Sequence, residues 1–186
     1  MTAGPDSAGA AGATATPSAT VPDWSREAKP LWAWDPSRSL LASLRAHQRR
    51  RGSGRLLDVV LRKVAVARHR FWSVVTGADI PIGCVIGGGL VMPHPNGVVI
   101  HCDAVVGPNC LIFQQVTLAA GPAGAPRIGG HVDIGAGAKI LGAVTIGDNA
   151  LIGANAVVVG DVPAGATAVG VPARVIGAAS VSPEPR

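Results

Sequence analysis

An aliphatic residue recurs at every sixth position through most of the C-terminal part of the chain. The continuous series comprises Ile128, Ile134, Ile140, Ile146, Ile152 and Val158. The same spacing occurs upstream at Ile100, Val106, Ile112 and Leu118, and before that at Ile80, Ile86 and Met92. A period of six fits neither an α-helix, which repeats every ~3.6 residues, nor a simple strand, which repeats every ~2. It predicts a mainly β fold, a parallel β-helix in which three short strands make one turn. The hexads suffice for roughly four turns.

The composition agrees with a coil that has a narrow interior. A small or β-branched residue follows each aliphatic residue of the continuous series by four positions, and glycine follows it directly in four of the six hexads. Aromatic residues make up only 3% of the chain and tyrosine is absent, so few large side chains can fill a broad core. We expect the aliphatic and small residues to point inward, with glycine where a Cβ would be crowded or φ positive.

The residues before the repeat have a different character. A first stretch of alanine, glycine, serine, threonine and proline offers little to bury and predicts a disordered tail. Two short helices are predicted next, over 36–50 and 54–72, and the second carries an apolar face. That face consists of Leu57, Val60, Leu61, Val64 and Phe71. We divide the chain into a tail at 1–22, a helical segment at 23–76, a β-helix at 77–177 and a flexible end at 178–186.

The excess of positive charge lies in the first 76 residues. Residues 1–76 hold twelve Lys or Arg against five Asp or Glu, whereas residues 77–186 hold four against six. A basic stretch is compatible with a nucleic-acid or membrane partner, but no nucleic-acid motif accompanies it, and we expect a solvated helix face and neither partner. The tryptophans before the helices are expected to pack against them or against another subunit. The three cysteines lack metal-ligand spacing, and without a secretory signal we expect a cytoplasmic protein with no metal.

The period of six is interrupted twice. Eight residues separate Met92 from Ile100, so two extra residues bulge out within 93–97. Ten residues separate Leu118 from Ile128, which predicts a protruding loop rich in glycine and alanine at 119–127. Insertions into a solenoid protrude from one face, and that face commonly binds ligands.

A set of ordered motifs spans Asp79 to Gly177. It comprises Asp79-Ile80, His94-x-x-Gly97-Val98-Val99-Ile100, Gln115-Val116-Thr117-Leu118, the segment 134–142 and Gly170-Val171-Pro172-Ala173-Arg174. In this set the chain resembles the catalytic domain of the serine O-acetyltransferases, within the hexapeptide-repeat acyltransferase superfamily. The resemblance implies a left-handed β-helix with a short N-terminal helical segment, and an acetyl-CoA-dependent O-acetyltransferase of cysteine biosynthesis.

Two residues match the family's catalytic pair. The resemblance implies that His94 removes the proton from the acceptor hydroxyl as it attacks the thioester carbonyl, and that Asp79 orients the imidazole. The spacing agrees, because Asp79 and His94 are fifteen positions apart, close to one turn of the coil. They can therefore lie in adjacent turns on one face, where a carboxylate can fix the imidazole tautomer.

The resemblance further implies that acetyl-CoA lies in a groove between two subunits of a homotrimer. Ala136 and Ala154 match positions where the family's backbone lines the pantetheine arm. Ala119–Ala120 stand where the family has a pair of glycines at the thioester end. Lys139 and Arg174 are candidates for the phosphates or the adenine end, and an ordinary surface role for these two charges is an equal alternative.

The acceptor-binding positions depart from the family. Pro93 stands where the family typically has an aspartate, Gly124-Ala125 replaces an Arg-His pair that helps hold the carboxylate, and Pro81-Ile82 replaces His-Pro. A zwitterion such as serine would thus lose counter-charges. The alternative is an acyltransferase of the same fold that acts on a sugar, a natural-product hydroxyl or amine, or a carrier-bound group.

Two less favoured functions use other features of the chain. One is a non-enzymatic β-helix scaffold whose basic helices bind a partner. The other is a zinc site of the carbonic anhydrase kind built from His94, His101 and His131, which is disfavoured because no second histidine lies near His131. The short helical segment favours a trimer over a dimer of trimers. The C-terminus lacks the isoleucine by which the family docks cysteine synthase, so we expect no such complex.

Overall fold

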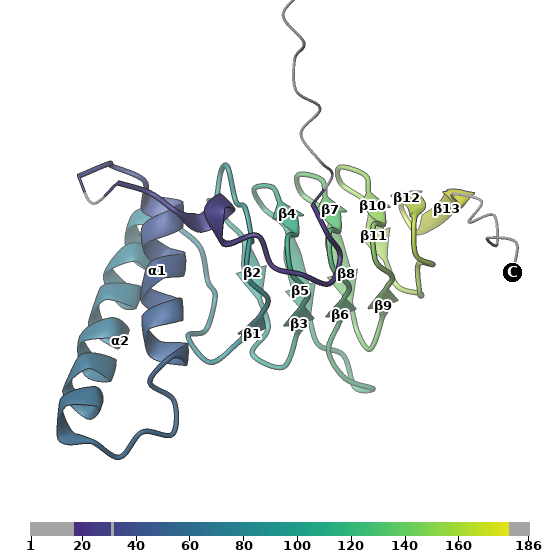
Figure 1. Cartoon of the computed structure of the whole chain (residues 1–186). Coiled ribbons are helices and arrows are strands. Elements are labelled where there is room, and N and C mark those ends of the chain that lie inside the picture. Colours follow the sequence, from purple (N-terminus) through teal and green to yellow (C-terminus); the bar gives the residue numbers. More distant parts are fainter. Residues whose placement is uncertain (1–16, 31, 179–186) are drawn as a thin grey trace, which may run out of the picture.

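The computed structural model describes residues 17–30 and 32–178, which form a β-helix covered at one end by two helices (Figure 1). Three sheets of short parallel strands make the faces of the coil. The first sheet contains β1 (Val85–Ile86), β3 (Val105–Val106), β6 (Arg127–Ile128) and β9 (Thr145–Ile146). The second contains β4 (Leu111–Ile112), β7 (Asp133–Ile134), β10 (Leu151–Ile152), β12 (Ala166–Gly170) and the antiparallel β13 (Ala173–Ala178). The third contains β2 (Val99–Ile100), β5 (Thr117–Ala119), β8 (Lys139–Leu141) and β11 (Val157–Val158).

The aliphatic residues of the hexads stack on one another inside the coil. In the first sheet Ile86 pairs with Val106, which pairs with Ile128 and then Ile146, and all four are buried. The predicted left-handed β-helix is confirmed. The coil has about five turns rather than the roughly four predicted, because the last turn is completed outside the period of six. There Val162 bridges to Ile146, and β12 pairs with β10.

The glycines at the corners serve both expected purposes, at different positions of the hexad. A Cβ on Gly107 would lie 2.4 Å from the carbonyl carbon of Gly129 in the next turn, so the position directly after the aliphatic residue is crowded. Positive φ instead falls two residues later, where Asn109 and Gln115 both have φ of 60°. Asparagine tolerates the left-handed conformation better than most side chains, and glycine takes the same position at Gly89 and Gly137, where φ is 80° and 74°.

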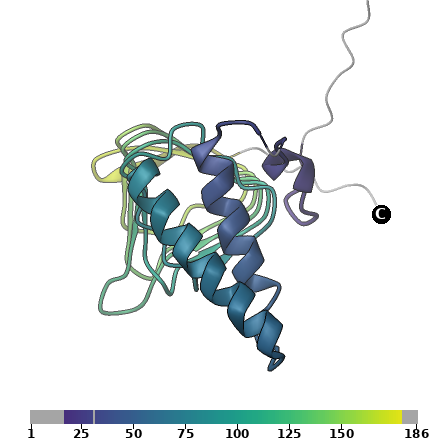
Figure 2. The ribbon, with the colours of Figure 1, turned by 90° about the vertical axis from the view of Figure 1, so that its left-hand side faces the viewer.

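The two predicted helices are present. Helix α1 (Pro36–Gln48) begins at Asp35, whose carboxylate accepts a hydrogen bond from the Arg38 amide at 2.9 Å. Helix α2 (Leu56–Thr76) extends four residues beyond its predicted end, because no breaker intervenes before Gly77, where φ is 66°. Figure 2 shows both helices lying across the end of the coil. Among the described residues, neither helix combines the length and hydropathy that a membrane span requires.

The apolar face of α2 points away from the rest of the described chain. Leu57, Val60, Val64 and Phe71 are exposed, Phe71 to 57%. The helix packs instead through its opposite side, which includes the buried His69. The periodicity thus located the helix and its apolar face, but not the side by which α2 joins the fold.

The segment before α1 lies along the coil. It contains a short 3-10 helix, η1 (Trp24–Glu27), and Figure 1 shows it crossing the strands. The Asn109 side chain accepts a hydrogen bond from the Asp23 amide at 2.8 Å and donates to the carbonyls of Ser18 and Val21. Residues 17–22 of the predicted tail therefore contact the coil, and residues 1–16 lie outside the described part. The C-terminal residues 179–186, on which the expectation about cysteine synthase rests, also lie outside it.

Two of the three tryptophans before the helices pack against them as expected. Trp24 stacks on the Arg45 guanidinium at 5.3 Å, and Trp34 meets Trp72 of α2 edge to face at 5.5 Å between centroids. Trp32 is 89% exposed.

Candidate active site

The two-residue insertion at 93–97 forms the first corner between the second and third sheets. The Gly97 amide donates to the Gly77 carbonyl at 2.9 Å, and the Val98 amide donates to the Pro95 carbonyl at 3.1 Å. The first bond anchors the C-terminal end of the bulge to the residue after α2, and the second closes the bulge on itself. His94 is exposed on it.

His94 lines a cavity of about 380 Å³ between this bulge and the ends of the two helices. The polar side chains of the cavity are those of Asp35, Ser37, Thr76, His94 and Asn96. Asp35 supplies the one carboxylate among the lining residues. The cavity therefore combines a candidate base with an anionic group.

Asp79 lies one turn away from the bulge but in a different cavity. Its backbone pairs with Val99, five residues after His94, so the two residues belong to adjacent turns. Asp79 is exposed and lines a cavity of about 500 Å³ beside α2, with Arg70 and Ser73. Within the described residues, no hydrogen bond or ion pair joins Asp79 to His94.

The corner that carries His94 continues along the coil to Ala136 and Ala154. The Gln115 amide donates to the Asn96 carbonyl at 2.9 Å, and the Asn155 amide donates to the Ala136 carbonyl at 2.8 Å. Because the Ala136 and Ala154 side chains are small, little protrudes from this corner beyond the 93–97 bulge. On the same corner, the Oε1 atom of Gln114 is buried and has no hydrogen-bond partner among the described residues.

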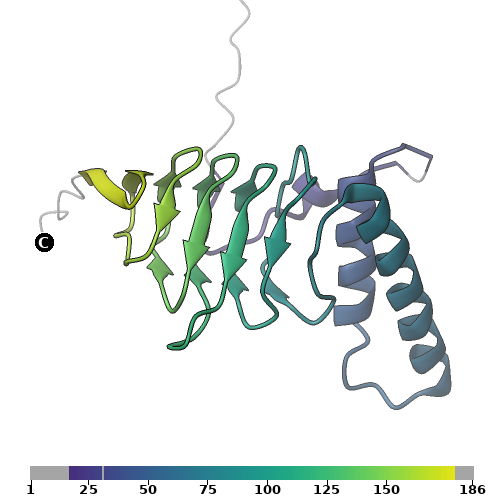
Figure 3. The same cartoon turned by 180° about the vertical axis from the view of Figure 1, so that it is seen from behind.

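The remaining CoA candidates lie elsewhere on the coil. The 119–127 loop protrudes as predicted, and the Gly121 amide donates to the Gly124 carbonyl at 2.8 Å (Figure 3). It follows β5, so Ala119–Ala120 lie at the opposite edge of the third sheet from His94. Lys139 of β8 donates to the Gln115 carbonyl at 2.5 Å, near the His94 corner. Arg174 is exposed in β13 at the far end of the coil.

The sequence and structure comparisons agree with one another. The family model for bacterial transferase hexapeptides (six repeats) matches residues 125–160. The chain is 47% identical over 126 residues to a serine acetyltransferase of Mycobacterium tuberculosis, covering 66% of this chain and 55% of that protein. It is 42% identical over 120 residues to the Escherichia coli serine acetyltransferase, covering 62% and 44%.

Solved structures give the same result. A serine acetyltransferase in complex with CoA superimposes with a TM-score of 0.64 at 35% identity, covering 77% of this chain and 58% of that one. The Neisseria gonorrhoeae serine acetyltransferase in complex with serine gives a TM-score of 0.63 at 38% identity, covering 76% and 57%. This chain is similar to the serine acetyltransferases and contains the bacterial transferase hexapeptide repeat. It spans about half the length of the curated relatives it matches.

The histidines of this serine acetyltransferase-like protein are spread around the coil. His94 lies at the corner between the second and third sheets and His101 at the corner between the third and first. His131 lies at the corner between the first and second, where its Nδ1 is 2.9 Å from Asn149 Oδ1. Within one chain, the three histidines of the zinc alternative therefore do not gather.

One group of potential metal ligands does occur among the described residues. The ligand atoms of His101, Cys102 and Asp103 lie within 4.8 Å of one another. The cluster lies on a different corner from His94 and outside the His94 cavity. It therefore supplies no group to the candidate active site of this chain.

Cys84, Cys102 and Cys110 are free thiols. Burial raises the pKa of Cys84 and of Cys110 to about 11, so both stay protonated near neutral pH. Neither is suited to act as a nucleophile.

Asp35 is the site residue that the sequence did not reveal. The run Asp35-Pro36-Ser37 is a normal helix start, and the Asp35 carboxylate does cap α1. Its position beside the His94 bulge depends on how the helical hairpin folds against the coil. The period of six in the β-helix sequence does not specify that packing.

Proposed function

We propose that the chain transfers an acetyl group from acetyl-CoA to the hydroxyl of serine or a serine-like small molecule. The observation that carries this proposal is the placement of His94. It is exposed on a two-residue bulge, at the mouth of a cavity, and on the corner that leads to Ala136 and Ala154.

The reaction needs only a base and a bound thioester. His94 removes the acceptor proton, the oxygen attacks the thioester carbonyl carbon, and the carbon–sulfur bond breaks. The proton taken by His94 then passes to the departing sulfur, which gives free CoA and an acetyl ester. A thioester is already activated, so no covalent enzyme intermediate is required. General base catalysis of this kind contributes about 10²–10⁴-fold.

Asp79 serves in this proposal as a positioning residue. It lies in the turn next to that of His94, and both side chains are exposed. A carboxylate that accepts from one imidazole nitrogen leaves the other free as base. Such contacts commonly tighten only when substrate binds, which is where we place the Asp79–His94 hydrogen bond.

The His94 corner fits the arm of CoA. Ala136 and Ala154 leave room for a thin ligand along this corner. Lys139 and Arg174 are the proposed partners of the phosphates or the adenine end. Bound acetyl-CoA supplies the activated acetyl group.

A homotrimer would complete the site. Ala119–Ala120 lie at the opposite edge of the third sheet from His94, too far round the coil to serve the same site in one chain. We propose that this edge of one copy faces the His94 corner of the next. A mass of about three chains in solution supports this arrangement, and a monomer that is fully active contradicts it.

The remaining assignments follow the same family likeness. We propose the helical segment 23–76 and the β-helix 77–177 as the structural units. The three free cysteines fit a reducing compartment such as the cytoplasm.

A different acceptor remains the second candidate. Pro93 and the Gly121–Gly124 hairpin provide none of the charges that the family places there, whereas Asp35 gives the cavity an anionic group that suits an amine. The test is product analysis by mass spectrometry after incubation with acetyl-CoA and L-serine, with a sugar and an amino alcohol in parallel. O-acetylserine formed at micromolar to millimolar KM supports the serine function. Saturable transfer only to another acceptor supports the second candidate, and no transfer to any acceptor contradicts both.

A further inference from the structure

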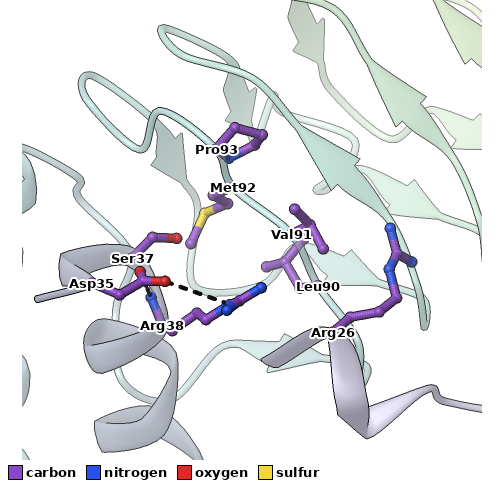
Figure 4. A pocket seen from close by; sticks show the side chains of 8 residues that line it. All are labelled: Arg26, Asp35, Ser37, Arg38, Leu90, Val91, Met92 and Pro93. Carbon is purple, nitrogen blue, oxygen red and sulfur yellow. Dashed lines mark hydrogen bonds and ion pairs between the residues drawn. The ribbon is translucent and has the colours of Figure 1, made fainter. Parts of the chain in front are cut away.

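A second cavity, of about 300 Å³, adjoins the His94 cavity. The two share Asp35, Ser37 and Pro93 as lining residues. Figure 4 shows the second cavity between the start of α1, the segment that contains η1 and the coil residues Leu90 to Pro93. These shared walls place the second cavity directly beside the one that His94 lines.

Two arginines line the second cavity. The Arg38 side chain is 41% exposed, and its Nε lies 3.5 Å from Asp35 Oδ2. In Figure 4 the Arg38 guanidinium reaches across the cavity toward Leu90. Arg26 closes the other end and donates from its guanidinium to the Asn109 carbonyl. With Asp35 as the one acidic lining residue, the cavity carries a net positive charge.

We propose that this cavity, with Arg38 as its main cation and Arg26 in support, binds an anionic group of the acceptor, a carboxylate or a phosphate. The proposal rests on the proposed acetyl transfer at His94 and names the acceptor class more closely. Guanidinium groups suit both anions because their fork of N–H donors matches paired oxygens.

The proposed subsite supplies cations in place of the charged pair that is missing at Gly124-Ala125. The 119–127 loop has Gly124-Ala125 in place of a charged pair, and its one cation, Arg127, lies where the loop ends in β6. Arg38 and Arg26 come instead from α1 and from η1, on the other side of Pro93. A proline at this junction adds no negative charge that would repel the anion.

The experiment compares two matched acceptor pairs: L-serine with serinol, which lacks the carboxylate, and glycerol 3-phosphate with glycerol. The kcat/KM with acetyl-CoA is measured for the wild type, for Arg38→Gln and Arg26→Gln, and for Arg51→Gln as the control at an exposed arginine outside both cavities. We expect the wild type to prefer the anionic member of at least one pair by about tenfold or more. The preferred pair identifies the carboxylate or the phosphate.

Arg38→Gln should abolish most of that preference, because it lowers kcat/KM for the anionic member much more than for the neutral member. Arg26→Gln should reduce the preference less, and Arg51→Gln should leave it intact. A preference that is absent in the wild type, or unchanged in Arg38→Gln, overturns the subsite while leaving the proposed function in place. Absence of transfer to all four acceptors counts against the proposed function instead. Calorimetric titration with inorganic phosphate then decides the subsite, because binding equal in wild type and Arg38→Gln overturns it and weaker binding in Arg38→Gln supports it.

Discussion

Arg45 of α1 and Glu27 of η1 form an ion pair of 2.8 Å, although their side chains are only 8% and 9% exposed. Arg45 also donates to the carbonyls of Ile86 and Gly87 in the first turn of the coil, at 2.6 Å each. Glu27 accepts from the Gly89 amide at 2.8 Å. One buried pair thus joins α1, the N-terminal segment and the coil.

Removal of one member of this pair should be costly, because the other charge stays buried without its partner. We expect Glu27→Ala to lower the free energy of unfolding by about 3 kcal/mol in urea denaturation. The control is Arg50→Ala, which breaks the more exposed pair with Asp58 at 3.7 Å and should cost about 1 kcal/mol or less. Equal losses in the two variants would show that the buried pair contributes no more to the free energy of unfolding than the exposed pair does.

The burial of His69 should make the free energy of unfolding depend on pH. Its Nε2–H donates to the Ile80 carbonyl at 2.7 Å, its Nδ1 lies 3.2 Å from Ser43 Oγ, and burial lowers its pKa below the ordinary 6.5. The unfolded chain then takes up the proton more readily. The contribution of His69 is therefore constant above about pH 6.5 and falls as the pH drops below that value.

The measurement is the free energy of unfolding of the wild type and of His69→Gln between pH 8 and pH 5. The difference between the two proteins should shrink on acidification, by no more than about 1.4 kcal/mol per pH unit. The pKa of His47 is also lowered, mainly by burial and only to a minor extent by His69, so most of its contribution is common to both proteins. A difference that is constant with pH would mean that His69 does not titrate as proposed.

The corners of the coil should reject a methyl group where backbones approach closely. A Cβ on Gly107 would lie 2.4 Å from Gly129, whereas one on Gly83 would meet nothing within 4 Å. We expect Gly107→Ala to destabilise the protein by about 1–3 kcal/mol and Gly83→Ala to change stability by less than about 0.5 kcal/mol. Thermal unfolding of the two variants measures this, and similar melting temperatures would contradict the crowding.

Asp79 should act through His94. Asp79→Asn is expected to lower kcat by about tenfold or more with little change in KM for acetyl-CoA. The double variant with His94→Ala should be no slower than His94→Ala alone, because residues that act as a unit are not additive. If the double variant is slower than His94→Ala by the same factor that Asp79→Asn causes alone, Asp79 does not act through His94.

The sequence predicted the coil better than it predicted the cavities. A period of six constrains every turn, so the inward residues such as Ile134 and Ile140 and the two interruptions could be located without the structure. Local signals also found both helices. The packing of α2 was not predictable, because His69 and Ala65 make its buried side while the stronger apolar stripe is exposed. For the same reason the places of Asp35 and Arg38 beside Pro93, which depend on how the hairpin covers the coil, could not be derived from spacing.

The most direct test of the proposed function is a single-turnover measurement of CoA release with saturating acetyl-CoA and acceptor, for the wild type and His94→Ala. Because His94 is exposed on its bulge, the substitution should leave the thermal unfolding curve unchanged, which serves as the control for folding. The account predicts that the rate falls by at least ~10²-fold in His94→Ala. A folded His94→Ala variant that releases CoA at the wild-type rate would contradict it.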